Sequence, residues 1–190
     1  MKKSHAFIII VIISILLSSI YGIIHDQITF TISEEYYTKF KFIQFGLNNW
    51  NIGQDIGTIS SPELKLYNPR LGVTIVGVIA TWWVGLLTGL LLGSVGLIHE
   101  NGKKMLFITL KAILITTGIA LVIGLMGLLF GKLFLTTSTP NWYFPNKLIH
   151  KDRFIMVGSM HNFSYIGGLI GLIISIRFSF KQKGKLEINT

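Results

Sequence analysis

The sequence predicts an all-α membrane protein, a four-helix transmembrane bundle with a sizeable extracytoplasmic loop between its first and second spans. Hydrophobic residues make up 51% of the 190-residue chain and charged residues only 13%, which is roughly half the charged share of a soluble domain. The apolar residues gather in four runs long enough to cross a bilayer. Basic residues flank these runs, as membrane topology requires.

Each predicted span is an apolar run between polar flanks. A hydrocarbon core about 30 Å thick needs about 20 helical residues. We therefore expect a single membrane domain over residues 1–190, with spans near 6–25, 71–98, 106–134 and 154–177. The connections are then outer loops over 26–70 and 135–153 and a short inner loop over 99–105. The first span is expected to be retained, because no small-residue cleavage site follows its long apolar run.

The distribution of Lys and Arg predicts the orientation. Lys2 and Lys3 precede the first span, Lys103 and Lys104 lie in the short connection between spans two and three, and further basic residues follow Arg177. Acidic residues largely offset the basic ones on the opposite side. Both termini are therefore predicted to be cytoplasmic.

The beginning of the long outer loop has two local signals. Ile28–Ile32 alternates apolar and polar residues, which favours a short extended stretch. Ser33 precedes two glutamates, which is typical of a helix N-cap with acids in the first turn. The predicted helix would carry Glu35 and Tyr36 back over the mouth of the bundle.

Glycines recur at four-residue spacing in three of the spans. This spacing lines one helix face with small residues and lets two backbones approach closely, as membrane helices commonly do. The glycines that follow the pattern are Gly85, Gly89 and Gly93, then Gly127 and Gly131, then Gly167 and Gly171.

Polar residues inside the spans are the candidates for function, because burying them without partners is costly. On the fourth span, His161, Asn162 and Tyr165 follow i, i+1, i+4 spacing and are expected to share a face. Trp82 on the second span is expected at a comparable depth, and Arg153 opens the fourth span. These residues, with Tyr36, are the predicted lining of a site.

Four of these polar residues form a candidate catalytic cluster. His25 and Asp26 lie at the outer end of the first span, Glu35 lies in the segment that folds back, and His161 lies below them in the fourth span. Two imidazoles with carboxylates suit a divalent ion such as Zn, Fe, Mn or Cu(II), so His25, Glu35 and His161 are the predicted metal ligands. The same residues would also serve acid–base or redox chemistry. Haem is less favoured, because His25 is expected to be shallower than His161. The alternative is that these residues form no functional site. His25 and Asp26 would then be a solvated helix end, and His161 a buried histidine that is hydrogen-bonded to a neighbouring helix.

Three stretches carry a resemblance: YGIIHDQITFTISEEYYT (Tyr21–Thr38), ATWWVGLLTG (Ala80–Gly89) and RFIMVGSMHNFSYIGG (Arg153–Gly168). They resemble uncharacterised bacterial four-span inner-membrane proteins with a His-Asp-Gln-x-Thr stretch followed by Glu-Tyr-aromatic-Thr. The resemblance implies this architecture and the bacterial cytoplasmic membrane, but no activity. It singles out His25, Asp26, Gln27, Thr29, Glu35, Tyr36, Arg153, His161 and Tyr165.

Composition narrows the function classes. The chain has no cysteine, so disulfides, thiolate metal sites and cysteine nucleophiles are excluded. Its net charge of +9 is explained by the flanks of the spans, so the lipid bilayer and not nucleic acid is the expected partner. Three hypotheses stay open: a metal-binding or acid–base site, a structural or assembly subunit of a membrane complex, and a small oligomeric transporter or channel.

Overall fold

The computed structural model describes residues 1–138 and 140–187, and it is built almost entirely from helices. Four of them are long and apolar enough to cross a membrane, which confirms the predicted all-α bundle and makes the chain an integral membrane protein. The elements are α1 (Lys3–Ile32), η1 (Tyr37–Lys41), α2 (Phe42–Gln44), η2 (Leu47–Trp50), β1 (Gly53–Asp55), β2 (Leu64–Leu66), α3 (Pro69–Gly96), α4 (Gly102–Phe130), η3 (Gly131–Leu135) and α5 (Lys151–Glu187).

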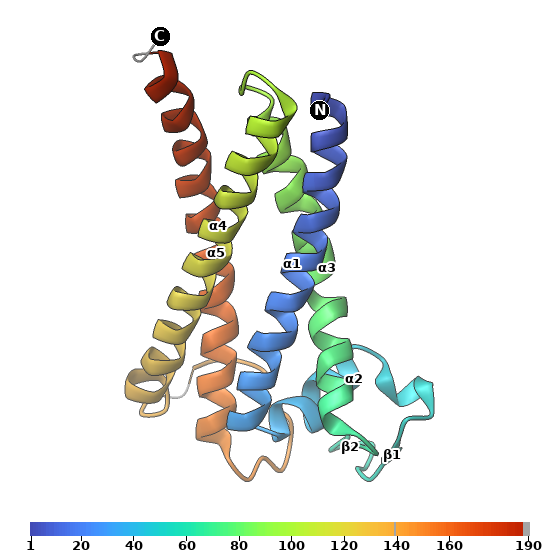
Figure 1. Ribbon diagram of the computed structural model, residues 1–190. Helices are drawn as coiled ribbons and strands as arrows, with labels where there is room; N and C mark the ends of the chain where they lie inside the picture. Colours follow the sequence, from blue (N-terminus) through green and yellow to red (C-terminus); the bar gives the residue numbers. More distant parts are fainter. Residues whose placement is uncertain (139, 188–190) are drawn as a thin grey trace.

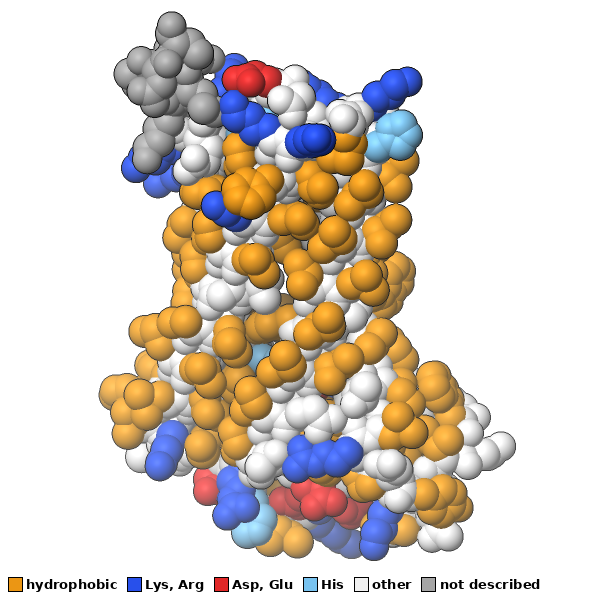
Figure 2. All heavy atoms as spheres, viewed as in Figure 1, with side chains coloured by type: hydrophobic (Ala, Val, Ile, Leu, Met, Phe, Trp, Pro, Cys, Tyr) orange, Lys and Arg blue, Asp and Glu red, His pale blue; other side chains and the backbone are white. Residues whose placement is uncertain are grey.

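The long helices form two pairs, α1 with α3 and α4 with α5 (Figure 1). Both termini lie at one end of the bundle, which we call the terminal end. The opposite end carries residues 33–68 and 140–150, and we call it the loop end. Apolar side chains cover the middle of the molecule, and charged side chains gather at the two ends (Figure 2). This distribution is the one that a bilayer requires.

Glycines bring the helices of each pair together, as predicted. A side chain at Gly85 would meet the backbone of α1 at Ser14 and Ile15. In the other pair, a side chain at Gly127 would meet Phe163 of α5, and one at Gly171 would meet the backbone at Thr116 of α4. The spacing therefore marks contact faces, where close backbone approach replaces the hydrophobic driving force that lipid removes.

Side-chain caps fix where two of the helices begin. The Asn68 carboxamide oxygen accepts from the Leu71 amide, and Pro69 occupies the first turn of α3, where its missing N–H costs nothing. The Asn101 carboxamide oxygen accepts from the amides of Lys103 and Lys104. Residues 97–101 suffice for the tight connection at the terminal end.

The predicted extended stretch at Ile28–Ile32 is wrong, because α1 continues as a helix through Ile32. Residues 22, 25, 26, 29, 30 and 33 are buried, so burial here has a helical period that the apolar alternation hid. Ser33 is not an N-cap either. It ends α1, its amide donates to the Thr29 carbonyl, and its hydroxyl is buried without a partner among the described residues.

The long loop packs onto the bundle. Its aromatic residues Tyr36, Tyr37 and Phe42 join Phe154 and Val157 of α5 in one buried cluster. The antiparallel pair β1–β2 lies beside it and contributes Leu64 and Leu66 to the same cluster. The connection between α1 and α3 thus covers the loop end of the bundle, above the polar residues of α1 and α5.

Candidate metal centre

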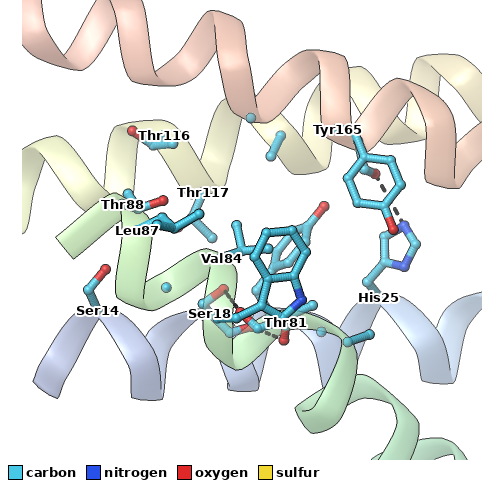
Figure 3. A pocket seen from close by; sticks show the side chains of 18 of the residues that line it. Ser14, Ser18, His25, Thr81, Val84, Leu87, Thr88, Thr116, Thr117 and Tyr165 are labelled. Carbon is cyan, nitrogen blue, oxygen red and sulfur yellow. Dashed lines mark hydrogen bonds between the residues drawn. The ribbon is translucent and has the colours of Figure 1, made fainter. Parts of the chain in front are cut away.

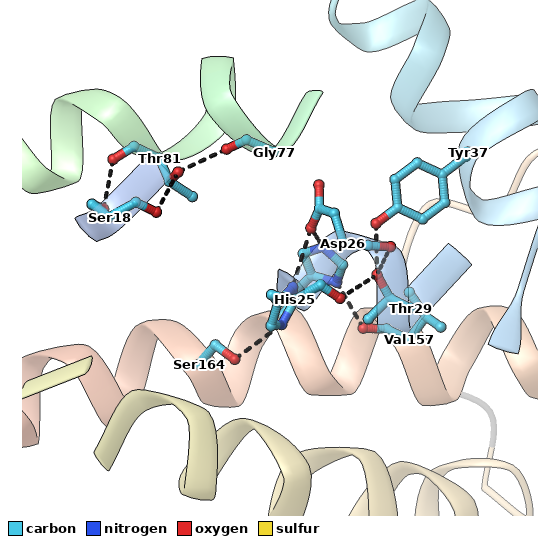
Figure 4. Close-up of polar contacts among 10 residues, drawn as sticks. Ser18, His25, Asp26, Thr29, Tyr37, Gly77, Thr81, Val157 and Ser164 are labelled. Carbon is cyan, nitrogen blue, oxygen red and sulfur yellow. Dashed lines mark hydrogen bonds and ion pairs between the residues drawn. The ribbon is translucent and has the colours of Figure 1, made fainter. Parts of the chain in front are cut away.

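Three buried polar side chains from two helix pairs converge beneath the loop end. His25 and Asp26 come from α1, and His161 comes from α5. The Asp26 Oδ1 atom lies 3.1 Å from His25 Nδ1 and 3.4 Å from His161 Nε2 (Figure 4). Each residue offers one donor atom, and the three atoms lie within 4.8 Å of one another. All three residues are less than 9% exposed.

The hydrogen bonds behind the imidazoles fix how they face Asp26. His161 Nδ1 lies 2.9 Å from the Val157 carbonyl oxygen, which can only accept, so Nδ1 carries the proton. His161 Nε2 then presents its lone pair toward the Asp26 carboxylate when the imidazole is neutral. His25 Nε2 lies 3.2 Å from the Ser164 hydroxyl. Metal-ligating histidines are typically oriented by such a bond from their second ring nitrogen.

The distance from His161 Nε2 to Asp26 Oδ1 favours an ion over a shared proton. A charge-assisted N–H···O bond is typically about 2.7–2.9 Å long, and the observed pair is 3.4 Å apart without hydrogen-bond geometry. Two ligand atoms about 2.0–2.2 Å from a tetrahedral metal ion lie about 3.3–3.6 Å apart. The separation of His161 Nε2 from Asp26 Oδ1 is therefore close to that of two donors on one ion, whereas His25 Nδ1 lies within hydrogen-bond distance of the same carboxylate oxygen, at 3.1 Å.

Aromatic side chains enclose the cluster. The Tyr36 ring stacks on His161 with ring centroids 5.0 Å apart, and Tyr21 lies 5.7 Å from the His25 ring. The Tyr37 hydroxyl lies 2.6 Å from the Thr29 hydroxyl, which donates to backbone carbonyls of α1. These contacts order the end of α1 and keep the surroundings of the three donors apolar, which strengthens electrostatic interactions there.

The cluster borders a cavity of about 400 Å³ between the two helix pairs. His25, Asp26 and His161 line it at the loop end, together with Lys41 from η1. Figure 3 shows that hydroxyl-bearing side chains follow the cavity away from His25 toward the middle of the bundle. A volume in this range is that of a small-molecule site, so the donor atoms face a space that can hold a ligand.

Of the other residues predicted to line the site, some lie beside the cluster or its cavity and others do not. Tyr36 stacks on His161, and Tyr165 lines the cavity. Trp82, Arg153 and Asn162 are exposed and do not line it. Neighbouring helical residues point about 100° apart, so Asn162 turns away from the direction of His161, and Trp83 takes the lining position expected of Trp82.

Glu35 is not with the histidines. Its carboxylate accepts from the Lys39 ammonium at 2.7 Å and from the amides of Ile149 and His150 at 2.8–3.1 Å. It therefore ties the first loop to the second, and Asp26 is the acid beside both imidazoles. The expectation that His25 is shallower than His161 is also wrong, because their ring centroids are only 4.6 Å apart. The two rings meet edge to face, which leaves no room for a porphyrin between them.

Glu35→Gln is expected to loosen the loop end. Burial raises the pKa of the Glu35 carboxyl, but the hydrogen bonds from Lys39 and the two amides outweigh it and hold the pKa below its ordinary value. A lowered pKa stabilises the fold above the unfolded value of about 4.3. We expect a loss of about 1 kcal/mol at neutral pH, since solvent screens part of the interaction.

The stability difference between wild type and Glu35→Gln should shrink as the pH falls through the acid range, because the wild-type carboxylate is then protonated. Thermal unfolding in detergent at several pH values measures this difference. Glu34→Gln is the matched control, since Glu34 is exposed beside it. An equal effect of both substitutions would contradict the role of Glu35.

Two further partners of the cluster, Tyr21 and Ser164, lie at positions to which helical spacing points. Tyr21 precedes His25 by one turn of α1, and Ser164 follows His161 by one turn of α5. Listing the i±3 and i±4 neighbours of each intramembrane histidine would have found both. Lys41 had no comparable signal, because it comes from the docked loop.

Comparisons with protein-family models, curated proteins and solved structures find no match to this chain.

Proposed function

We propose that this chain is an integral membrane protein that holds a divalent transition-metal ion through His25 Nδ1, Asp26 Oδ1 and His161 Nε2. The observation that supports this proposal is the environment of the two ring nitrogens of His161. Its Nδ1 proton is committed to Val157, and its free Nε2 faces a carboxylate oxygen at 3.4 Å. In the neutral imidazole, two lone pairs so placed repel each other unless a cation lies between them, and a metal ion supplies that cation without a second ring proton.

The donor set favours an active centre over a structural one. Structural zinc sites usually have four protein ligands, whereas catalytic sites keep three and leave a position open. Two histidines and one carboxylate also form the ligand set of non-haem iron centres. Since the same three residues line the cavity, an open position would face it. The proposed function is therefore metal-dependent acid–base or redox chemistry on a ligand in that cavity.

Metal analysis of the protein, purified in detergent without chelator, tests this function. About one zinc, iron, manganese or copper ion per chain is expected, removable by a chelator and restored by adding back the metal. Removal of the ion should lower the unfolding temperature, because the ion binds only the folded site. A chain that neither retains nor takes up any of these metals would contradict the proposal.

We also propose that the terminal end is cytoplasmic and that the membrane is the bacterial inner membrane. Lys2, Lys3, Lys103 and Lys104 all lie at that end, and such basic residues usually stay inside. Because the chain has no cysteine, a single introduced one reports its side. A membrane-impermeant maleimide should label Ile59→Cys in intact cells and Glu100→Cys only after lysis. Both positions are exposed, and the reverse pattern would overturn the assignment.

A further inference from the structure

The cavity beside the cluster opens sideways. Its lining residues on α1 and α4 are buried or half-buried. By contrast, Trp83 and Leu87 on α3 are 47% and 50% exposed, and Tyr165 and Leu169 on α5 are 56% and 66% exposed. Helices α1 and α4 therefore form the floor, and α3 and α5 form the rims. These rims belong to the apolar flank that faces lipid, so a ligand could enter from the bilayer.

The lining suits a hydrocarbon chain. It runs along α1 from Asp26 to Ser14, a distance of about 18 Å of helix. Many of its hydroxyls donate to carbonyls within the bundle, as Ser18 does to Thr81, Thr116 to Ala112 and Thr117 to Ile113. The walls thus present mainly carbon to the cavity, and of the lining hydroxyls those of Ser14 and Tyr21 have no hydrogen-bond partner among the described residues.

The loop end of the cavity carries a buried cation. Lys41 is only 7% exposed, and its ammonium lies 5.9 Å from the Tyr36 ring centroid and 5.3 Å from that of Phe45. Among the side chains that the structure describes, residues 1–138 and 140–183, no carboxylate lies within ion-pair distance of it. Burial lowers the pKa of Lys41, so its charged form lacks sufficient compensation. An anionic group in the cavity would supply it.

We propose that the cavity binds a single-chain lipid acid, with its carboxylate beside Lys41 and the His25–Asp26–His161 cluster and its tail along the channel toward Ser14. This orientation matches a lipid in the bilayer, whose head lies near the surface and whose tail points to the middle. The inference names the substrate class of the proposed metal centre and rests on it for the chemistry at the head group. The tail channel and Lys41 are independent of the ion.

Quenching of tryptophan fluorescence by 9,10-dibromostearate in detergent tests the binding, because Trp83 lines the cavity. Quenching should saturate and should be reversed by unbrominated stearate. Gly168→Leu should weaken binding at least about tenfold, since it fills the channel and removes several methylene contacts. Gly118→Leu is the matched control. A side chain meets nothing within 4 Å at either glycine, but only Gly168 lines the cavity.

Lys41→Met replaces the side chain by an unbranched one that is one atom shorter and uncharged. The substitution should weaken binding of the acid and leave competition by methyl stearate unchanged. This test does not require that Gly168→Leu folds. Non-saturable quenching that is equal in wild type and both glycine variants would overturn the inference. So would equal binding of acid and ester by wild type.

Titrations of metal-loaded and chelator-treated protein separate the two proposals. Saturable binding by a chain that takes up no metal would contradict the metal centre and support the lipid site. A chain with its metal that does not bind the probe saturably would overturn the lipid site alone.

Discussion

Asp26→Asn is expected to abolish stoichiometric metal binding while the bundle stays folded. Asparagine keeps the shape of the side chain but removes the anion that both imidazoles face. Residues that only orient metal ligands contribute about 10–100-fold in affinity, so loss of this ligand should cost at least about 100-fold. Metal analysis of the purified variant measures it. Asp152→Asn, the same change at an exposed acid of α5, should retain the ion.

The unfolding temperatures of wild type and Asp26→Asn, measured with and without metal, test whether the Asp26 carboxylate stabilises the fold only when an ion is bound. An ion present at about 100 times its dissociation constant stabilises the fold by about 2.7 kcal/mol, so wild type should lose stability on chelation and Asp26→Asn should not. Without a metal, the amide of asparagine can donate to His161 Nε2, which has no hydrogen-bond partner among the described residues. An Asp26→Asn chain that is more stable than wild type both with added metal and after chelation would contradict a metal centre.

The sequence was sufficient to predict the spans and to name His25, Asp26 and His161 as members of one candidate cluster. Long apolar runs determine the spans, since few other structures accommodate them. His25 and His161 stood out because an imidazole in a span needs a partner. Their convergence depends on the offset of α1 against α5. That offset is set by packing across two helix pairs and cannot be read from the period of either helix.

Glu35 was predicted to join the two histidines, and the structure places it elsewhere. The alternating pattern at Ile28–Ile32 predicted that the helix ends soon after His25, so that the chain could fold back over it. Instead α1 continues through Ile32, and Glu35 lies ten residues beyond His25, where it binds the second loop. Asp26 was available beside His25 throughout, but adjacent helical residues rarely face one partner. Here both His25 and Asp26 are buried, and the Asp26 carboxylate contacts both imidazoles.

Gly77→Ala is expected to destabilise the bundle more than its size suggests. A Cβ atom on Gly77 would lie 2.7–2.8 Å from backbone atoms of Gly22 and Ile23 in α1. Backbone cannot yield as a flexible side chain does, so α1 and α3 must separate. Overpacking of this kind costs about 1–3 kcal/mol. Because Gly22 is one turn before His25, the separation should also displace His25 from Asp26 and His161 and lower the metal content.

Gly118→Ala is the control for Gly77→Ala, since both add one methyl group to a helix interior. A side chain at Gly118 meets nothing within 4 Å, so only the gain in helix propensity of about 0.5–1 kcal/mol applies. The difference between the two variants in thermal unfolding therefore isolates the contact between α1 and α3. Two variants of equal stability would mean that these helices are not in backbone contact. A destabilised Gly77→Ala with full metal content would mean that the position of His25 does not depend on this contact.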